Sequence, residues 1–292
     1  MADLPVPDSL KPLMELRGKE MTAREAFALF CLPPRPPLAR REQEVISTAK
    51  PVPFRFRGRE VMAYKWGSGP VVALAHGWGA RAGTMTAFVE PLVESGFSVI
   101  APDHLGHGES EGTQCNALWV SQCWDLLAQE HGGFHGAVTH SFGSLGINLY
   151  HARGGPLSRV VHLAPFNEVL KRFLEFSAAL DMNVQREAGF LSFCEDWFGS
   201  GRLASIKGEK LAPQMTAEAL IMHDEEDGDI PFSDAEGLAG AWGLSTLVRT
   251  KGLGHRRIIR EKNVIRQSVS FLSEGKLDAI STQLPADFGI LR

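Results

Sequence analysis

The sequence predicts an α/β fold, with a doubly wound parallel sheet that carries helices on both faces. From residue 52 onward, short apolar runs rich in Val and Ile alternate with longer segments of helical spacing, and this alternation is typical of such a fold. The later apolar runs are almost unbroken, as expected of parallel strands covered on both faces. The 292 residues, 44% of them hydrophobic, suffice for one large domain with a sizeable core.

Eight apolar runs are candidate strands, and several segments between them are candidate helices. The strands are expected at residues 54–57, 61–66, 71–76, 98–103, 137–140, 160–164, 219–223 and 246–250. The helices are expected at residues 84–95, 117–129, 143–153 and 233–242. Strand and helix therefore alternate along the chain, with one long interruption after residue 164.

The N-terminal segment, residues 1–40, forms a preamble to this alternation. Thr22 and Glu25 make a capping box, which predicts a short helix over the following AFALF. That helix should end before Pro33, because the residue before a proline is biased away from helix. We expect the preamble to lie against the main body, and a partner-docking arm is the alternative.

Composition and charge exclude several classes of function. The net charge is −4, whereas nucleic-acid-binding proteins usually carry a basic excess, so we expect no nucleic-acid partner. The cysteines have neither disulfide nor zinc-site spacing; they are Cys31, Cys115, Cys123 and Cys194. The sequence shows no secretory signal pattern and no apolar run near the ~20 residues of a membrane span, so a cytoplasmic protein is expected. Its oligomeric state cannot be read from the sequence.

The strongest local signal is the segment AVTHSFGS, in which an apolar strand leads through a tight turn at Ser141 into a helical pattern. Such a turn forces the serine into a strained conformation that exposes its hydroxyl, and the helix N-terminus favours developing negative charge. Small residues are needed two positions to either side of the serine. Gly143 fits this need, and Thr139 stands where glycine is more common. Ser141 is therefore the candidate nucleophile.

A serine hydroxyl needs a base, and His255 is the best placed of the ten histidines. It follows the last apolar strand in the segment KGLGHRR, and so lies at the carboxyl end of a strand, where sites in open α/β sheets form. We expect the side chain of His140 to point away from Ser141. His223 ends a strand and is expected to be packed and hydrogen bonded.

The base in turn needs a carboxylate that holds its tautomer and stabilises the imidazolium. The run IMHDEEDGDIP, at the end of the seventh predicted strand, offers several candidates: Asp224, Glu225, Glu226, Asp227 and Asp229. A solvated acidic loop would account for most of these side chains, but one of them can be catalytic.

A tetrahedral intermediate also needs backbone N–H groups directed at its oxygen. Phe142 would supply one, as the residue after the nucleophile. Trp78, in the turn LAHGWGA, would supply the other, because Gly77 and Gly79 allow close approach. The two residues form the predicted oxyanion hole, and the indole of Trp78 could also line an acyl pocket.

The long interruption after the sixth predicted strand contains aromatic residues at helical spacing. A structureless loop of that length is unusual in a compact domain, so we predict a helical cap over the active site, with extra core packing as the alternative. The predicted organisation is a preamble (1–40), an α/β core (41–165 and 214–292) and a cap insertion (166–213). The side chains expected to bind substrate are Trp78, Phe142, Phe173 and Trp197.

Taken in order, these motifs resemble those of the α/β-hydrolase superfamily, in particular its bacterial esterase-like members. The resemblance runs from about residue 52 to the end of the chain. It rests on AHGWG (75–79), APDHLGHGES (101–110), THSFGS (139–144), IMHDEEDGDIP (221–231) and GLGH (252–255). It implies an eight-stranded, mostly parallel sheet whose first strands are antiparallel, and it makes DHLGHGES a structural turn.

The resemblance also selects the acid. Members of the family order their catalytic residues Ser…Asp…His and typically read H-G-x-x-D-x-x-V-P at the acid turn. Matching His223 and Pro231 to the ends of that pattern places the acid on Asp227. The same match puts Asp224 where glycine is common, which is a departure from the pattern.

The implied function is that of a serine esterase acting on carboxylic esters of small to medium acyl chains. Ser141 would form the acyl-enzyme, His255 would pass its proton to the leaving alkoxide, and Asp227 would hold His255. A thioesterase, a lactonase or a C–C bond hydrolase would use the same triad, and a non-catalytic ligand-binding member of the fold is the remaining alternative. The chemistry requires neither a metal nor an organic cofactor.

Overall fold

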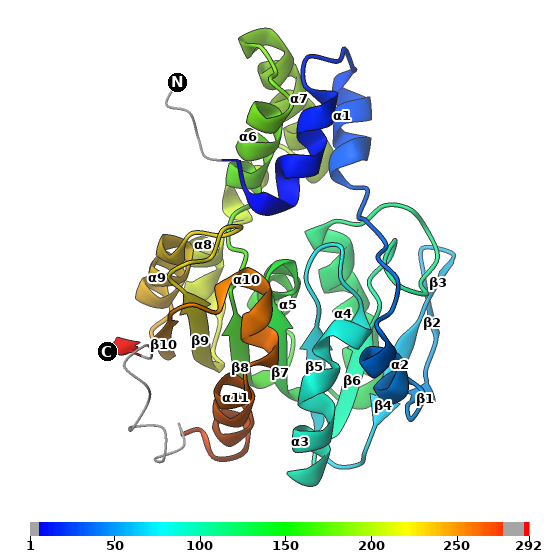
Figure 1. Ribbon diagram of the computed structural model, residues 1–292, viewed down its shortest axis with the longest axis vertical. Coiled ribbons are helices and arrows are strands. Elements are labelled where there is room, and N and C mark those ends of the chain that lie inside the picture. The colour runs from blue at the N-terminus through cyan, green and yellow to red at the C-terminus, as the bar shows by residue number, and fades with distance from the viewer. Residues whose placement is uncertain (1–5, 277–288, 292) are drawn as a thin grey trace.

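The fold is seen in a computed structural model, which describes residues 6–276 and 289–291. One sheet runs through the molecule in the strand order β1-β4-β6-β5-β7-β8-β9-β10-β11 (Figure 1). The centre of the sheet is parallel and consists of β6, β5, β7, β8, β9 and β10. At the two sides the pairing is antiparallel, between β1 and β4, β4 and β6, and β10 and β11. The predicted mostly parallel α/β sheet is therefore confirmed.

The strands are short and follow the apolar runs of the sequence. They are β1 (Lys50–Pro51), β2 (Phe54–Phe56), β3 (Arg59–Val61), β4 (Ala63–Trp66), β5 (Val71–Ala75), β6 (Ser98–Pro102), β7 (Phe134–His140), β8 (Leu157–Leu163), β9 (Glu218–Asp224), β10 (Ser245–Thr250) and β11 (Gly289–Leu291). Leaving out the separate pair β2–β3, the strands β1 to β10 give the expected number of eight, with β1 in the sheet in place of the predicted strand at 54–57, and β11 adds a ninth at the edge beside β10.

One predicted strand lies outside the main sheet. The run at 54–57 does not join the main sheet, because β2 folds back on β3 as a separate two-stranded hairpin. The two residues of its turn, Arg57 and Gly58, both have positive φ, at 52° and 76°. Two-residue turns of that kind match the twist of a hairpin, so the local turn chemistry decides the pairing.

Helices cover both faces of the sheet. They are α2 (Arg40–Ile46), α3 (Val89–Glu94), α4 (Ala117–His131), α5 (Phe142–Ala152), α8 (Gly208–Leu211), α9 (Phe232–Ala241), α10 (Gly254–Arg257) and α11 (Lys262–Glu274), with turns of 3₁₀ helix at Ala82–Phe88, Leu203–Ser205, Ala212–Gln214 and Ile258–Arg260. Along β5, Val72 and Leu74 belong to the apolar cluster of α3 and α11, whereas Ala73 and Ala75 belong to that of α4, α5 and α9. This alternation along one strand buries both faces.

A further group of helices lies beyond one end of the sheet (Figure 1). This helical layer consists of η1 (Asp8–Leu16), α1 (Ala23–Phe30), α6 (Val169–Ala179) and α7 (Val184–Phe198). Helix α1 begins at the predicted capping box, in which Thr22 and Glu25 bond reciprocally, and its Phe27 ring contacts Phe173 and Phe198. The division into preamble, core and cap stays a prediction, but α1 lies in one layer with α6 and α7. Among the described residues, none of the helices has both the length and the apolar character of a membrane span.

Candidate active site

Ser141 lies at the apex of the turn between β7 and α5. Its backbone has φ 51° and ψ −122°, a strained conformation that non-glycine residues rarely adopt. The turn is tight because the start of α5 passes close to the end of β5: a Cβ atom on Gly143 would lie 2.4 Å from the carbonyl oxygen of Ala75. The structure thus presents the serine in the conformation that the motif predicts.

Thr139, which departs from the common glycine, has a role in supporting this turn. Its buried hydroxyl lies 2.8 Å from the hydroxyl of Ser144 and 2.6 Å from Nδ1 of His162. The other ring nitrogen of His162 lies 2.9 Å from the side-chain oxygen of Asn148. These contacts join β7 to β8 and α5 next to Ser141. Thr139 is larger than the glycine common at this position, but its hydroxyl provides hydrogen bonds that glycine cannot make.

Three turns bring Ser141, His255 and Asp227 together. The Nε2 atom of His255 lies 3.0 Å from Oγ of Ser141, and its Nδ1 lies 2.8 Å from Oδ2 of Asp227. With Nδ1–H donating to the carboxylate, Nε2 can accept the serine proton. Ser141 is 8% exposed and the side chain of His255 13% exposed, so the reacting atoms are nearly enclosed but reachable.

Both oxygens of the Asp227 carboxylate accept hydrogen bonds. Its Oδ1 accepts from the backbone N–H groups of Asp229 and Ile230, at 2.8 and 2.9 Å, and its Oδ2 also lies 3.2 Å from Nε2 of His223. Burial opposes ionisation of this group, but the hydrogen bonds from His223, His255 and Ile230 outweigh it and hold the pKa of Asp227 well below its ordinary value. Asp227 therefore carries its charge when it faces the imidazole.

Asp224, on the same turn, contacts the loop before the base rather than the base itself. Its carboxylate accepts from the Thr250 hydroxyl at 2.7 Å and from the N–H of Leu253 at 2.9 Å. Burial opposes ionisation, but the N–H groups of Gly254 and Leu253 and the Thr250 hydroxyl lower the pKa of Asp224 below its ordinary value. The acidic run thus contains two carboxylates with separate contacts, and the departure from glycine at 224 supplies an anchor for the loop that carries His255.

His140 lies closer to the base than expected. Its Nε2 is 2.8 Å from the backbone carbonyl oxygen of His255, and the two rings lie 4.8 Å apart. Burial, with His255 nearby, lowers the pKa of His140 to about 3, so the ring stays neutral and donates through Nε2–H. The side chain of His140 therefore holds the backbone of His255, the predicted base, a contact that sequence reasoning missed because the two residues are 115 positions apart.

The turn after β5 passes directly beside the nucleophile. A Cβ atom on Gly77 would lie 3.1 Å from Cβ of Ser141, and the ring of Trp78, the next residue, lies 5.1 Å from that of Phe142. The structure therefore brings both predicted oxyanion residues to Ser141. Whether their N–H groups bind the oxyanion stays a prediction.

The segment DHLGHGES supports that turn from behind. Nε2 of His107 accepts the N–H of Gly79 at 3.1 Å, and the carboxylate of Asp103 accepts the N–H groups of Ala82 and Glu109, at 2.7 and 2.8 Å. Burial lowers the pKa of His107 well below its ordinary value, so the ring remains a neutral acceptor. These contacts fit a structural turn.

The other two side chains expected to bind substrate lie in the helical layer. Phe173 is fully buried and contacts Phe27 and Phe30. Trp197 is 38% exposed, and its ring contacts those of Phe27, Trp119 and Phe198. Their binding roles stay predictions, and Phe173 presents almost no accessible surface.

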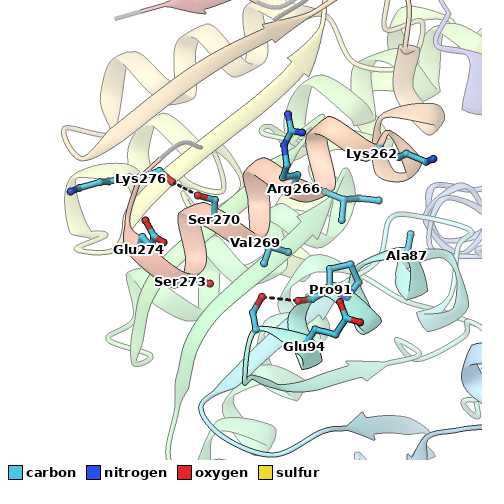
Figure 2. A pocket seen from close by; sticks show the side chains of 12 residues that line it. Ala87, Pro91, Glu94, Lys262, Arg266, Val269, Ser270, Ser273, Glu274 and Lys276 are labelled. Carbon is cyan, nitrogen blue, oxygen red and sulfur yellow. Dashed lines mark hydrogen bonds between the residues drawn. The ribbon is translucent and has the colours of Figure 1, made fainter. Parts of the chain in front are cut away.

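Two hollows on the surface lie away from Ser141, His255 and Asp227. One of about 890 Å³ lies between α3 and α11 (Figure 2), and its lining includes Pro91, Val269 and Ser270 but no histidine. Another of about 1410 Å³ lies beside α2 and likewise does not reach Ser141. Nowhere in the described part of the chain do three or more side chains of His, Cys, Asp or Glu gather so that they could hold a metal ion.

Comparisons with known proteins agree with this fold. Residues 68–189 match the family model described as serine aminopeptidase, S33, and no curated protein matches the sequence. Among solved structures, an esterase from Thermogutta terrifontis is 17% identical, with a TM-score of 0.54 over 72% of this chain and 93% of its own. A meta-cleavage product hydrolase from Pseudomonas fluorescens IP01 is 20% identical, with a TM-score of 0.56 over 75% and 96%. The thioesterase domain of a curacin biosynthetic pathway is 16% identical, with a TM-score of 0.57 over 77% and 99%. At these identities the likeness shows the fold.

Proposed function

We propose that this chain belongs to the α/β-hydrolase superfamily, with which its fold and the family model over residues 68–189 agree, and that it is a serine hydrolase that cleaves carboxylic esters through an acyl-enzyme. One observation carries the proposal: Ser141, His255 and Asp227 form a continuous hydrogen-bonded series at a strained strand-to-helix turn. A nucleophile, a base within 3.0 Å of it and a charged group that orients the base are the parts that acyl transfer requires.

Each triad residue has one step to perform. Oγ of Ser141 attacks the carbonyl carbon while its proton passes to Nε2 of His255, and the Asp227 carboxylate stabilises the resulting imidazolium. Collapse of the tetrahedral intermediate breaks the bond to the alkoxide, which takes the proton from Nε2. Water then repeats the sequence against the acyl-enzyme and releases the acid.

The backbone around the turn would stabilise the intermediate. The N–H of Phe142 is at the N-terminus of α5, and Gly77 and Trp78 lie against Ser141. Donors fixed in advance at the position of developing charge typically contribute ~3 kcal/mol each. We propose that the N–H groups of Phe142 and Trp78 have this role, and that the helical layer is a cap over it.

Thioesters, lactones and C–C bonds remain alternatives on the same triad. The structural neighbours include a thioesterase domain and a meta-cleavage product hydrolase, but at a likeness that concerns the fold. We rank C–C bonds behind esters because a carbanion leaving group would have to be stabilised before it takes a proton, whereas an alkoxide needs only the proton that His255 already carries.

The test is hydrolysis of p-nitrophenyl esters from acetate to palmitate by the wild type and by Ser141→Ala. We expect wild-type turnover and a loss of about 10⁴-fold or more in the variant. Ser270→Ala, in the hollow between α3 and α11 (Figure 2), is the matched control and should keep full activity. Equal turnover in wild type and Ser141→Ala would overturn the proposal.

A further inference from the structure

We propose that the N-terminal helix α1 completes the acyl-binding site, and that Phe30 at its end determines the acyl-chain length that the enzyme accepts. The inference rests on the proposed function, because it places the acyl group on Ser141. It assigns a role to the preamble, for which the sequence offered only packing or partner docking.

The chain before α1 is fixed to the turn of the catalytic acid. The N–H of Asp8 donates to the carbonyl oxygen of Gly228 at 3.2 Å, and the N–H of Ser9 donates to the carboxylate of Asp229. Gly228 and Asp229 directly follow Asp227. The N-terminal segment therefore touches the active site at its beginning and is not a free arm.

The chain after α1 crosses the oxyanion turn. A Cβ atom on Gly79 would lie 2.6 Å from Cγ of Pro34, and the guanidinium of Arg35 donates to the carbonyl oxygens of Gly106 and Ser110, both at 2.6 Å. The N–H of Cys115 also donates to the carbonyl oxygen of Cys31 at 2.8 Å. The N-terminal segment is thus held against two turns of the active site, at the start of η1 and directly after the end of α1.

Within α1, Phe27 and Phe30 have different surroundings. Phe27 is buried at 7% exposure, and its ring contacts belong to α6 and α7. Phe30 is half-buried and lies between the helical layer and the oxyanion turn. Its ring is 4.5 Å from that of Phe173 and 6.4 Å from that of Trp78.

A row of aromatic rings therefore leads away from the nucleophile. Phe142 follows Ser141, Trp78 contacts Phe142 at 5.1 Å, and Phe30 contacts Trp78 in turn. All three rings offer apolar faces suited to hydrocarbon, and Trp78 and Phe30 keep part of their surface accessible. Because Phe30 is the third ring from Ser141, it would meet the far part of an acyl chain and not its carbonyl end.

The experiment changes the size of Phe30 in both directions. In Phe30→Ala we expect the ratio of kcat/KM for octanoate to that for butanoate to rise about tenfold or more, since single methylenes discriminate by about that factor in apolar sites. In Phe30→Trp the same ratio should fall. Phe27→Leu is the matched control from the same helix, and it should leave the ratio unchanged.

A second readout separates the acyl site from the ester chemistry. Alkyl p-nitrophenyl phosphonates with chains of two to twelve carbons react with an activated serine: Oγ of Ser141 bonds to phosphorus, p-nitrophenolate leaves, and the serine proton passes to His255. Labelling rates at Ser141, followed by mass spectrometry, should show the same shift in chain-length preference. Phe30→Leu provides a milder variant, and unfolding midpoints verify that each variant is folded.

The outcomes distinguish the two proposals. A chain-length preference that is identical in wild type and both Phe30 variants overturns the role of Phe30, even if ester hydrolysis is found. An equal shift in Phe27→Leu overturns it as well, because general loosening of the helical layer would then be the cause. If the chain-length preference of labelling shifts in the Phe30 variants but the protein has no esterase activity, the acyl site is supported and the ester proposal is removed. No labelling of Ser141 by any chain length removes both.

Discussion

The turns at the carboxyl ends of the strands and the helical layer above them are held in place by different forces. The turns are fixed by hydrogen bonds that involve buried polar side chains: the Asp224 carboxylate accepts from the loop before His255, and His140 donates to the backbone carbonyl oxygen of His255. The helical layer is fixed by contacts between aromatic rings, such as Phe27 with Phe173 and Phe198. Hydrogen bonds are directional and define positions within tenths of an ångström, whereas apolar packing tolerates exchanges of similar volume.

This difference separates two kinds of task. Proton transfer needs fixed geometry, so we expect changes in the turns to reduce turnover on every substrate. Selection of an acyl group needs an apolar surface of suitable size, so changes in the helical layer should alter substrate preference and local stability. Each of the following predictions tests that separation.

The largest effect is expected at the acid of the triad. Asp227→Asn should lower turnover by about 10⁴-fold, because an amide would favour the wrong tautomer of His255. Asp229→Asn is the matched control on the same turn: its carboxylate accepts from Ser9 and not from the imidazole, so it should stay active. Steady-state kinetics on one short ester compares the two. Loss of turnover in Asp229→Asn alone would show that the acid is misassigned.

The next effect is expected at Asp224. Asp224→Ala leaves the hydroxyl of Thr250 and the N–H of Leu253 without their acceptor, which should lower the free energy of unfolding by about 3 kcal/mol. Because the loop before His255 is then less well held, kcat should fall while KM for short esters changes little. Urea titration and kinetics measure both.

Glu225→Ala is the control for Asp224→Ala. Glu225 lies on the same turn, but its carboxylate pairs with Arg249 at a half-exposed surface, where such pairs contribute at most about 1 kcal/mol. If Glu225→Ala lowered the free energy of unfolding as much as Asp224→Ala does, the proposed role of Asp224 in holding the loop before His255 would be refuted.

The same two regions explain how much could be predicted from the sequence. The turns carry residues whose chemistry is specific and whose spacing is regular, so the mostly parallel sheet and the grouping of Ser141, His255 and Asp227 could be predicted. The supporting contacts of His140 and Asp224 could not be, because they join segments distant in the sequence without any motif.

The helical layer was harder to predict for a physical reason. A capping box and an apolar spacing define a helix such as α1, but they do not define which neighbour its face packs against. Apolar packing does not specify a partner, so Phe27 and Phe30 look alike in the run AFALF. Of these two described rings, that of Phe30 contacts Trp78 and that of Phe27 contacts rings of α6 and α7. The separate β2–β3 hairpin was not predicted either, because its pairing is decided by the two-residue turn at Arg57 and Gly58.

Stability should depend on pH through the turns. Hydrogen bonds hold the pKa of both Asp224 and Asp227 below the ordinary value in the folded protein. A carboxyl group with a lowered folded-state pKa stabilises the fold above its unfolded pKa of ~3.9, and that stabilisation is lost as the pH falls further. Burial also lowers the pKa of His140 and His107 in the folded protein, so these neutral rings destabilise the fold as the pH falls below their unfolded pKa of ~6.5. We therefore expect urea midpoints to fall gradually from about pH 6.5, and a further decline from the two carboxylates below about pH 4. This further decline should be shallower in Asp224→Ala, and a parallel decline would contradict this assignment.

The smallest effect is expected at the start of α1. Thr22 Oγ accepts the N–H of Glu25 at 3.2 Å, so Thr22→Ala should lower the stability of the helix by about 1 kcal/mol. The loss should be local: amide exchange should quicken in α1 but not in α5, because α5 is fixed by the polar network beneath Ser141. Glu25→Gln keeps the capping geometry and should leave exchange unchanged. Turnover on acetate should survive in both variants, whereas selectivity between long and short acyl chains should weaken in Thr22→Ala. A loss of acetate turnover in Thr22→Ala would mean that α1 positions the reacting groups themselves, and the separation between the two regions would fail.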